Sequence, residues 1–248
     1  MKPVERFSDR ATDYAAGRPS YPDAAFDALF EGTEPAHLTA VDLGAGTGIS
    51  SRLLAARVAL VIAVEPNAAM REQAEPTANL RWSTGTAEET GLEAGSCDIV
   101  CAFQAFHWFD YHTALLEMVR ILRPGGRAAI VYNERDETNA FTAEYGTLVR
   151  RYATDQTERR RSDGRAAFES FSEWKDVRIA EIRNAQMLDR DRLHARARST
   201  SYVPHEGDAA ETLHRELDAL FNEHAKVGNV EMLLKTIVTT AFPFAALH

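Results

Sequence analysis

The stretch VDLGAGTGIS, from Val41 to Ser50, decides the fold of this chain. It begins inside an apolar run, residues 39–43, that suits a buried strand, and glycines follow at alternate positions. Glycine adopts positive φ without strain and lets a ligand approach the backbone, so Gly44, Gly46 and Gly48 predict a sharp turn. Leu53, Leu54 and Arg57 come next at helical spacing, so the free N–H groups of a helix start face the turn. Such a helix start suits an anionic group.

A second apolar strand, Leu60 to Val64, supports this interpretation. It ends at Glu65, 21 residues beyond Gly44. A carboxylate at that place can accept both hydrogen bonds from a ribose diol. The two strands and the helix between them therefore predict a nucleoside-binding βαβ unit, and a turn that merely connects strand and helix is the plainer alternative.

The spacing of the glycines separates two kinds of nucleotide ligand. A dinucleotide fingerprint requires a third glycine where this chain has Ile49. The spacing G-x-G-x-G, two residues after Asp42, resembles the first motif of the class I S-adenosylmethionine (SAM)-dependent methyltransferases. This resemblance implies that the cofactor lies against Asp42, Gly44, Ala45 and Gly46.

The same resemblance extends along the chain to the other cofactor contacts. In the family, residues just past the acid flank the adenosine, which here are Pro66 and Met70. A third strand, Leu80 to Ser83, leads to a loop that resembles the family's adenine-binding loop, with Thr86 where aspartate is common. A backbone contact at Ala87 is therefore the expected one, and Glu88 is expected to brace the loop.

The segment that follows the fourth strand, residues 98–103, is expected to lie beside the reacting centre. Ligands of doubly wound sheets bind at the carboxyl ends of the strands, near the point where strand order reverses. The sequence QAFHWFD resembles that of the type-11 methyltransferases, and within them that of the trans-aconitate methyltransferase-like enzymes, which act on small molecules. Gln104 is therefore expected at the cofactor, and Phe106, His107 and Trp108 in the substrate pocket.

His107 is the candidate general base, because an imidazole with a pKa near neutrality can take a proton from an acceptor. The alternative is that His107 only shapes the pocket. His107 and His112 are five residues apart with no cysteine or paired acids nearby, so we expect no metal site.

The rest of the chain divides by pattern into a cover, a helical insertion and two further strands. By resemblance, Tyr14 and Arg18 belong to an N-terminal cover over the cofactor, and Tyr132, Ser199 and Tyr202 line the substrate pocket. The predicted parts of this single domain are the cover (1–38), the SAM-binding core (39–132), a helical insertion that caps the substrate (133–172), and strands six and seven with intervening helices (173–248). The sixth and seventh strands are predicted at 177–182 and 235–244.

Composition limits the partners. The net charge of −9 speaks against nucleic acid, which needs clustered cations. Arginines do gather between Arg150 and Arg165, where they serve either a small anionic substrate or, more commonly, a solvated helix face. Cys97 and Cys101 fit the core of a protein in a reducing compartment, and the sequence shows neither a signal peptide nor a membrane span, so we expect a cytoplasmic protein.

Together these patterns predict an α/β, Rossmann-like, seven-stranded class I methyltransferase sheet in the order 3-2-1-4-5-7-6, with strand 7 antiparallel and a helical cap. The expected activity is transfer of a methyl group from SAM, which leaves S-adenosylhomocysteine, to a small, carboxylate-bearing acceptor by in-line displacement. No metal, nucleic acid or membrane is expected, and the chain is a monomer or a homodimer. Two alternatives stay open: a non-catalytic SAM-binding sensor or scaffold, and an NAD-dependent dehydrogenase.

Overall fold

The computed structural model describes residues 18–154, 156–200 and 202–244, and its centre is a mixed sheet of seven strands in the order β3-β2-β1-β4-β5-β7-β6. The predicted strand order is confirmed. The strands are β1 (Thr39–Leu43), β2 (Leu60–Val64), β3 (Leu80–Ser83), β4 (Cys97–Phe103), β5 (Leu122–Arg135), β6 (Trp174–Leu188) and β7 (Val230–Pro243).

Strand direction changes at one strand. The pairs β1 with β2, β1 with β4, β2 with β3 and β4 with β5 are parallel. Only β7, which lies between β5 and β6, runs antiparallel to both neighbours. The sheet order reverses between β1 and β4, so the carboxyl ends of these two strands define the crevice where a ligand is expected.

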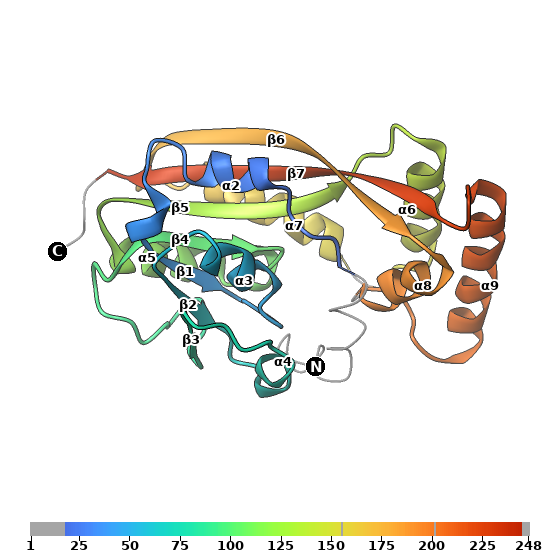
Figure 1. Ribbon diagram of the computed structural model, residues 1–248, viewed down its shortest axis with the longest axis horizontal. Helices are drawn as coiled ribbons and strands as arrows, with labels where there is room; N and C mark the ends of the chain where they lie inside the picture. Colours follow the sequence, from blue (N-terminus) through green and yellow to red (C-terminus); the bar gives the residue numbers. More distant parts are fainter. Residues whose placement is uncertain (1–17, 155, 201, 245–248) are drawn as a thin grey trace.

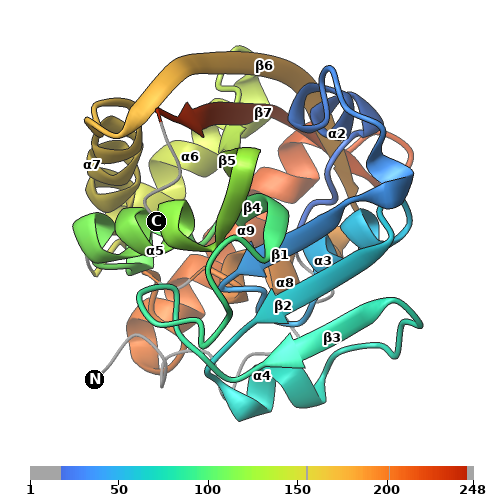
Figure 2. The ribbon, with the colours of Figure 1, turned by 90° about the vertical axis from the view of Figure 1, so that its left-hand side faces the viewer.

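Helices cover both faces of the sheet (Figure 2). On one face lie α2 (Asp23–Leu29) and α3 (Ile49–Ala55), and on the other α5 (Tyr111–Ile121) and α7 (Thr157–Glu169). The central strands are therefore buried on both sides and read as continuous apolar runs. Cys97 and Cys101 on β4 are fully buried free thiols, which confirms their place in the core.

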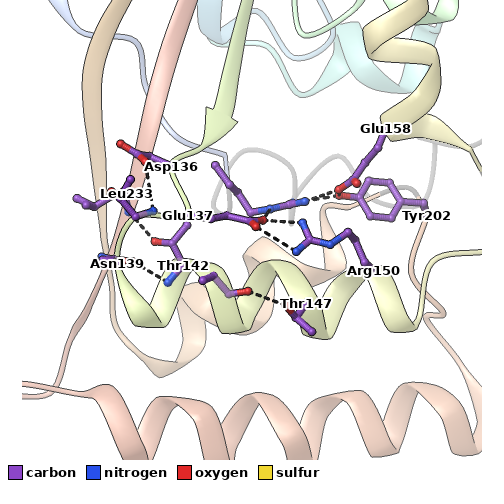
Figure 3. Close-up of polar contacts among 12 residues, drawn as sticks. Asp136, Glu137, Asn139, Thr142, Thr147, Arg150, Glu158, Tyr202 and Leu233 are labelled. Carbon is purple, nitrogen blue, oxygen red and sulfur yellow. Dashed lines mark hydrogen bonds and ion pairs between the residues drawn. The ribbon is translucent and has the colours of Figure 1, made fainter.

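A second hydrophobic core lies beyond the sheet, where β5, β6 and β7 extend past their neighbours (Figure 1). We call its helices the helical cap: α6 (Ala140–Arg151), α8 (Arg190–Arg198) and α9 (Gly207–His224). Figure 3 shows how α6 is attached: Asn139 caps it, and Thr142 Oγ1 accepts a hydrogen bond of 3.0 Å from the N–H of Leu233 on β7.

Strands β6 and β7 are longer than the sequence predicts, and packing against the helical cap supplies the reason. The predicted sixth strand covers only 177–182 of β6, and the predicted seventh strand omits the first five residues of β7. Those extra residues pair with each other and bury Leu188, Val230, Met232 and Leu234 against the cap, a contact that local patterning does not reveal. The remaining short elements are η2 (Pro35–His37), α4 (Ala68–Glu72) and η3 (Phe106–Trp108).

Candidate active site

The glycine loop, residues 44–48, is held tightly between two strand ends. The N–H groups of Gly44 and Ala45 donate to the carbonyl of Val64 at the end of β2, at 2.8 and 3.1 Å. Gly44 has a φ of +67°, and a Cβ placed there would lie 2.7 Å from the Cβ of Ala105, just after β4. Glycine is therefore required at this position, because a side chain would have to displace the segment that follows β4.

Asp42 supports this loop from inside. It is fully buried, and its Oδ2 accepts hydrogen bonds from the hydroxyls of Ser50 (2.7 Å) and Ser51 (2.6 Å) in the first turn of α3. Burial raises its pKa to about 6. The carboxyl group therefore ties β1 to α3 and fixes the turn between them.

Glu65 lies at the end of β2, opposite the glycine loop. Its Oε2 accepts from the N–H of Gly46 and its Oε1 from the N–H of Asn67, both at 2.9 Å. Burial raises the pKa of Glu65, while these two hydrogen bonds act to lower it. Each oxygen keeps a second lone pair, so the carboxylate can still accept hydrogen bonds from a diol.

The residues that follow β2 and β3 complete the predicted adenosine side. Asn67 caps α4, which brings Pro66 and the buried Met70 next to Glu65. Ala87 is buried, whereas Thr86 is exposed and its hydroxyl accepts from the N–H of Glu89 in a local turn. Glu88 accepts a 2.9 Å hydrogen bond from the N–H of Asp110, so it links this loop to the segment after η3.

Gln104, the first residue after β4, has a strained backbone with a φ of +53°. Its amide nitrogen donates to the carbonyl of Asn133 at 2.9 Å, but its Oε1 is buried with no hydrogen-bond partner. A positive φ is uncommon in a residue other than glycine and often marks a functional site. With Arg18 and Gly44, Gln104 lines a cleft of about 400 Å³, counted out to the solvent. Tyr14, the other predicted cover residue, lies outside the described residues.

The aromatic segment forms the short helix η3 at the same end of the sheet. Phe106 and His107 are buried there, with Trp108 partly exposed. The hydroxyl of Tyr132, on β5, accepts from the N–H of His107 at 3.1 Å and lies 3.5 Å from its Nδ1. Burial, followed by the charge of Arg161, holds the pKa of His107 well below its ordinary value. The imidazole is therefore neutral at neutral pH, and a weak base.

The predicted substrate residues from the end of the chain reach the same region. Arg18 Nη2 donates to the carbonyl of Ser199, at the end of α8, at 2.8 Å. The Tyr202 hydroxyl accepts from Arg135 Nη1 at 3.2 Å and lies 3.4 Å from Glu158, to which Arg135 also bonds (Figure 3). The fold thus brings the cover, β5, α7 and the cap together around one polar interior.

The arginine run separates into surface and interior members. Arg150 pairs with Glu137, Arg151 with Glu216, Arg159 with Asp163 and Arg165 with Glu134. Most of the run is therefore a solvated, ion-paired surface. Arg161 differs, because its Nε is buried with no hydrogen-bond partner.

Sequence reasoning missed Arg135 and Arg196 and did not single out Arg161. Arg135 is neutralised by Glu158 and by Glu137, whose Oε1 is 3.5 Å from Arg135 Nε. Burial lowers the pKa of Arg161 and brings that of Arg196 to about 10. The signal was present as an arginine-rich sequence, but helical spacing alone does not say which arginine points inward.

Side chains away from the glycine loop bear on metal ions and membranes as partners. Across 18–154, 156–200 and 202–244, one group of side chains could offer three ligand atoms to a metal ion: Glu144, Glu223 and His224, in the cap on α6 and α9. Exposed acidic groups often gather in this way, and these residues lie on other elements than the glycine loop. None of the helices in the described part of the chain is long and apolar enough to cross a membrane.

Comparison with known proteins agrees with the fold and the glycine loop. Residues 41–130 match the family described as "Methyltransferase domain". The seven-stranded sheet with its antiparallel β7 is the class I methyltransferase fold. The chain therefore has the class I methyltransferase fold, and its residues 41–130 are similar to the methyltransferase domain of this family.

Individual relatives are similar over different lengths. An uncharacterised methyltransferase of Mycobacterium tuberculosis is 40% identical over 149 residues, which are 58% of this chain and 59% of that relative. An uncharacterised methyltransferase-like protein of Schizosaccharomyces pombe is 27% identical over 96% of this chain and 94% of its own length. The structure of a putative type II methyltransferase from Anaeromyxobacter dehalogenans superposes with a TM-score of 0.63 at 26% identity, covering 90% of this chain and 96% of that one.

Proposed function

We propose that this chain transfers a methyl group from SAM to a small, carboxylate-bearing acceptor. The observation that carries the proposal is the glycine loop facing the Glu65 carboxylate across the ends of β1 and β2, in a fold of the methyltransferase class. The cleft at Gln104 fits the group, because it is lined by Gly44, Ala45 and Arg18, and because Gln104 Oε1 is a buried acceptor without a partner.

In this proposal each element holds one part of the cofactor. Glu65 accepts hydrogen bonds from the ribose hydroxyls, and the loop at Ala87 borders the adenine. The methionine end is held by Gly44, Gln104 and Arg18. Asp42 acts indirectly, since both of its hydrogen bonds go to α3. The bound sulfonium supplies an activated methyl group. The protein then has to hold the acceptor in line with the bond between sulfur and the methyl carbon, and to exclude water. Orientation of the reactants can lower the activation barrier by roughly 7 to 11 kcal/mol in favourable cases.

We propose a positioning role for His107. Its neutral ring and its contact with Tyr132 suit a wall that fixes the acceptor, whereas its lowered pKa makes it an inefficient proton acceptor. A carboxylate acceptor needs no base, because it is already ionised at neutral pH. His107→Gln should therefore raise the KM for the acceptor more than it lowers kcat. A kcat that falls by orders of magnitude with KM unchanged would assign His107 to proton transfer instead.

Calorimetry with S-adenosylhomocysteine tests the cofactor site. Glu65→Ala removes two charge-assisted hydrogen bonds to the ribose, so the affinity should fall at least about 100-fold. Glu72→Ala, an exposed acid on α4, is the matched control and should leave it unchanged. Equal affinity in wild type and Glu65→Ala would remove the ribose assignment.

Two further measurements separate the alternatives. Transfer of tritium from methyl-labelled SAM to a panel of small acids and phenols distinguishes an enzyme from a SAM-binding sensor, which binds SAM without turnover. Titration with NAD addresses the dehydrogenase hypothesis, against which Ile49 stands as the first residue of α3 where the fingerprint needs glycine. Tight NAD binding without SAM binding would overturn the proposal.

A further inference from the structure

The interior between η3, α7 and the cap contains more positive charge than its carboxylates neutralise. Arg135 has two acidic partners, Glu158 and Glu137. For Arg161 and Arg196, by contrast, no carboxylate of the described residues lies within ion-pair distance. A buried cation normally has a paired anion, because desolvation of an unpaired charge is costly.

The packing of α7 brings Arg161 to the expected reacting centre. Gly164 allows α7 to approach η3 closely, since a Cβ there would lie 3.4 Å from the ring of Phe106. The Tyr111 hydroxyl donates to the carbonyl of Arg160 at 2.9 Å and fixes the same turn. Arg161, the next residue, therefore lies beside η3, and its buried Nε has no partner. The charge of Arg161 acts on both His107 and Tyr132.

Arg196 reaches this interior from the cap side. It is half-buried on α8, three residues before Ser199, whose carbonyl holds Arg18. Its electrostatic neighbours are Tyr145, Tyr202 and two further arginines, Arg18 and Arg135. Neither tyrosine carries a carboxylate, so none of these four neighbours forms an ion pair with Arg196.

We propose that Arg161 and Arg196 hold the anionic end of the methyl acceptor, and that this acceptor is a small organic molecule with at least two negative charges. The inference rests on the proposed function. It narrows the acceptor to a class, a dicarboxylate or a phosphomonoester, because neither guanidinium has a carboxylate partner in the described part of the chain. Guanidinium groups bind either anion in a bidentate manner. A monocarboxylate would leave one of the two arginines unpaired.

Anion binding can be measured without turnover. The first probe is sodium sulfate against sodium chloride at equal ionic strength, with the apparent melting temperature as readout; sulfate should raise it for the wild type and less for Arg161→Gln and Arg196→Gln. The matched control is Arg159→Gln, an exposed arginine of the same helix paired with Asp163, which should respond as the wild type does. Equal responses of all four proteins would overturn the assignment of the anion site.

A second probe set identifies the class. The probes are succinate, glycerol 3-phosphate, butyrate and succinamide, titrated by calorimetry in the presence of S-adenosylhomocysteine. At least one of the two dianions should bind, and the monoanion butyrate should bind more weakly. Each arginine variant should lose roughly 30-fold or more in affinity for the bound dianion. Binding of succinate would identify the anionic group as carboxylate, and binding of glycerol 3-phosphate would identify it as phosphate. Equal binding of dianions, butyrate and succinamide, or no binding of either dianion, would overturn the proposal.

The cofactor titration keeps the two proposals apart. Arg161→Gln and Arg196→Gln should bind S-adenosylhomocysteine as the wild type does, which also reports that they are folded. If the wild type itself does not bind S-adenosylhomocysteine, the methyltransferase proposal fails. The sulfate experiment still reports on the anion site in that case. If the cofactor binds but the anion response is indifferent to both arginines, only the acceptor inference fails.

Discussion

Gly44→Ala tests whether the glycine loop is held by the contact that the structure shows. The change has two separable costs. Alanine at a φ of +67° costs about 1 to 2 kcal/mol, because its Cβ crowds the following carbonyl. The new Cβ would also lie 2.7 Å from Ala105 Cβ and 3.2 Å from the ring of Phe109, well inside the roughly 3.5 to 4 Å of an ordinary carbon contact. Overpacking of this kind costs typically about 1 to 3 kcal/mol.

The sum is a loss of about 2 to 5 kcal/mol in the free energy of unfolding, measured by urea denaturation. Gly91→Ala is the matched control, since Gly91 has a φ of +72° and nothing within 4 Å of a Cβ placed there. It should show the backbone cost alone. The difference between the two variants isolates the steric part, and Gly44→Ala alone should also weaken S-adenosylhomocysteine binding.

A double-mutant cycle with Ala105→Gly completes the test. Removing the Ala105 methyl group should restore part of the steric loss of Gly44→Ala, about 1 kcal/mol or more, and none of the backbone loss. Contacting residues give such coupling, whereas independent sites add within about 0.5 kcal/mol. Additive losses in the double variant, or equal losses for Gly44→Ala and Gly91→Ala, would refute the proposed contact between the loop and the segment after β4.

The remaining predictions concern charge in the interior. Burial lowers the pKa of His107 and of His214, and His214 Nδ1 lies 2.7 Å from His194 Nδ1. The folded chain therefore binds fewer protons than the unfolded chain below about pH 6.5. The free energy of unfolding should fall as pH decreases through that value. Melting curves between pH 7.5 and 5 should show a shallower fall for His107→Gln and His214→Gln than for the wild type or the exposed His112→Gln; identical slopes would contradict the assignment. Arg196→Met should be more stable than the wild type in anion-free buffer, by about 1 kcal/mol or more, because it removes a half-buried charge for which the described residues offer no carboxylate partner. A loss of stability in urea denaturation would show that the guanidinium is already compensated.

Much of the fold and the conformation of the glycine loop could be predicted from sequence, because their signals are local. The glycine turn and the acid at the end of the second strand each depend on residues within a few positions of one another. Cys97 and Cys101 in an apolar run predicted a buried strand for the same reason. The order of the strands came from the resemblance that these motifs carry, and the structure confirmed it.

The length of β6 and β7 and the membership of the polar interior depended on tertiary structure. The extended strand ends are stabilised by burial against α6, α8 and α9, which belong to distant parts of the sequence. Arg18, Arg135, Arg161 and Arg196 come from four separate elements, and only their packing decides which of them has a carboxylate within reach. By itself, the sequence determined the glycine turn between β1 and α3, since backbone conformation is set by neighbouring residues. The charge of the polar interior was decided by the tertiary structure, since electrostatic pairing depends on distance in space.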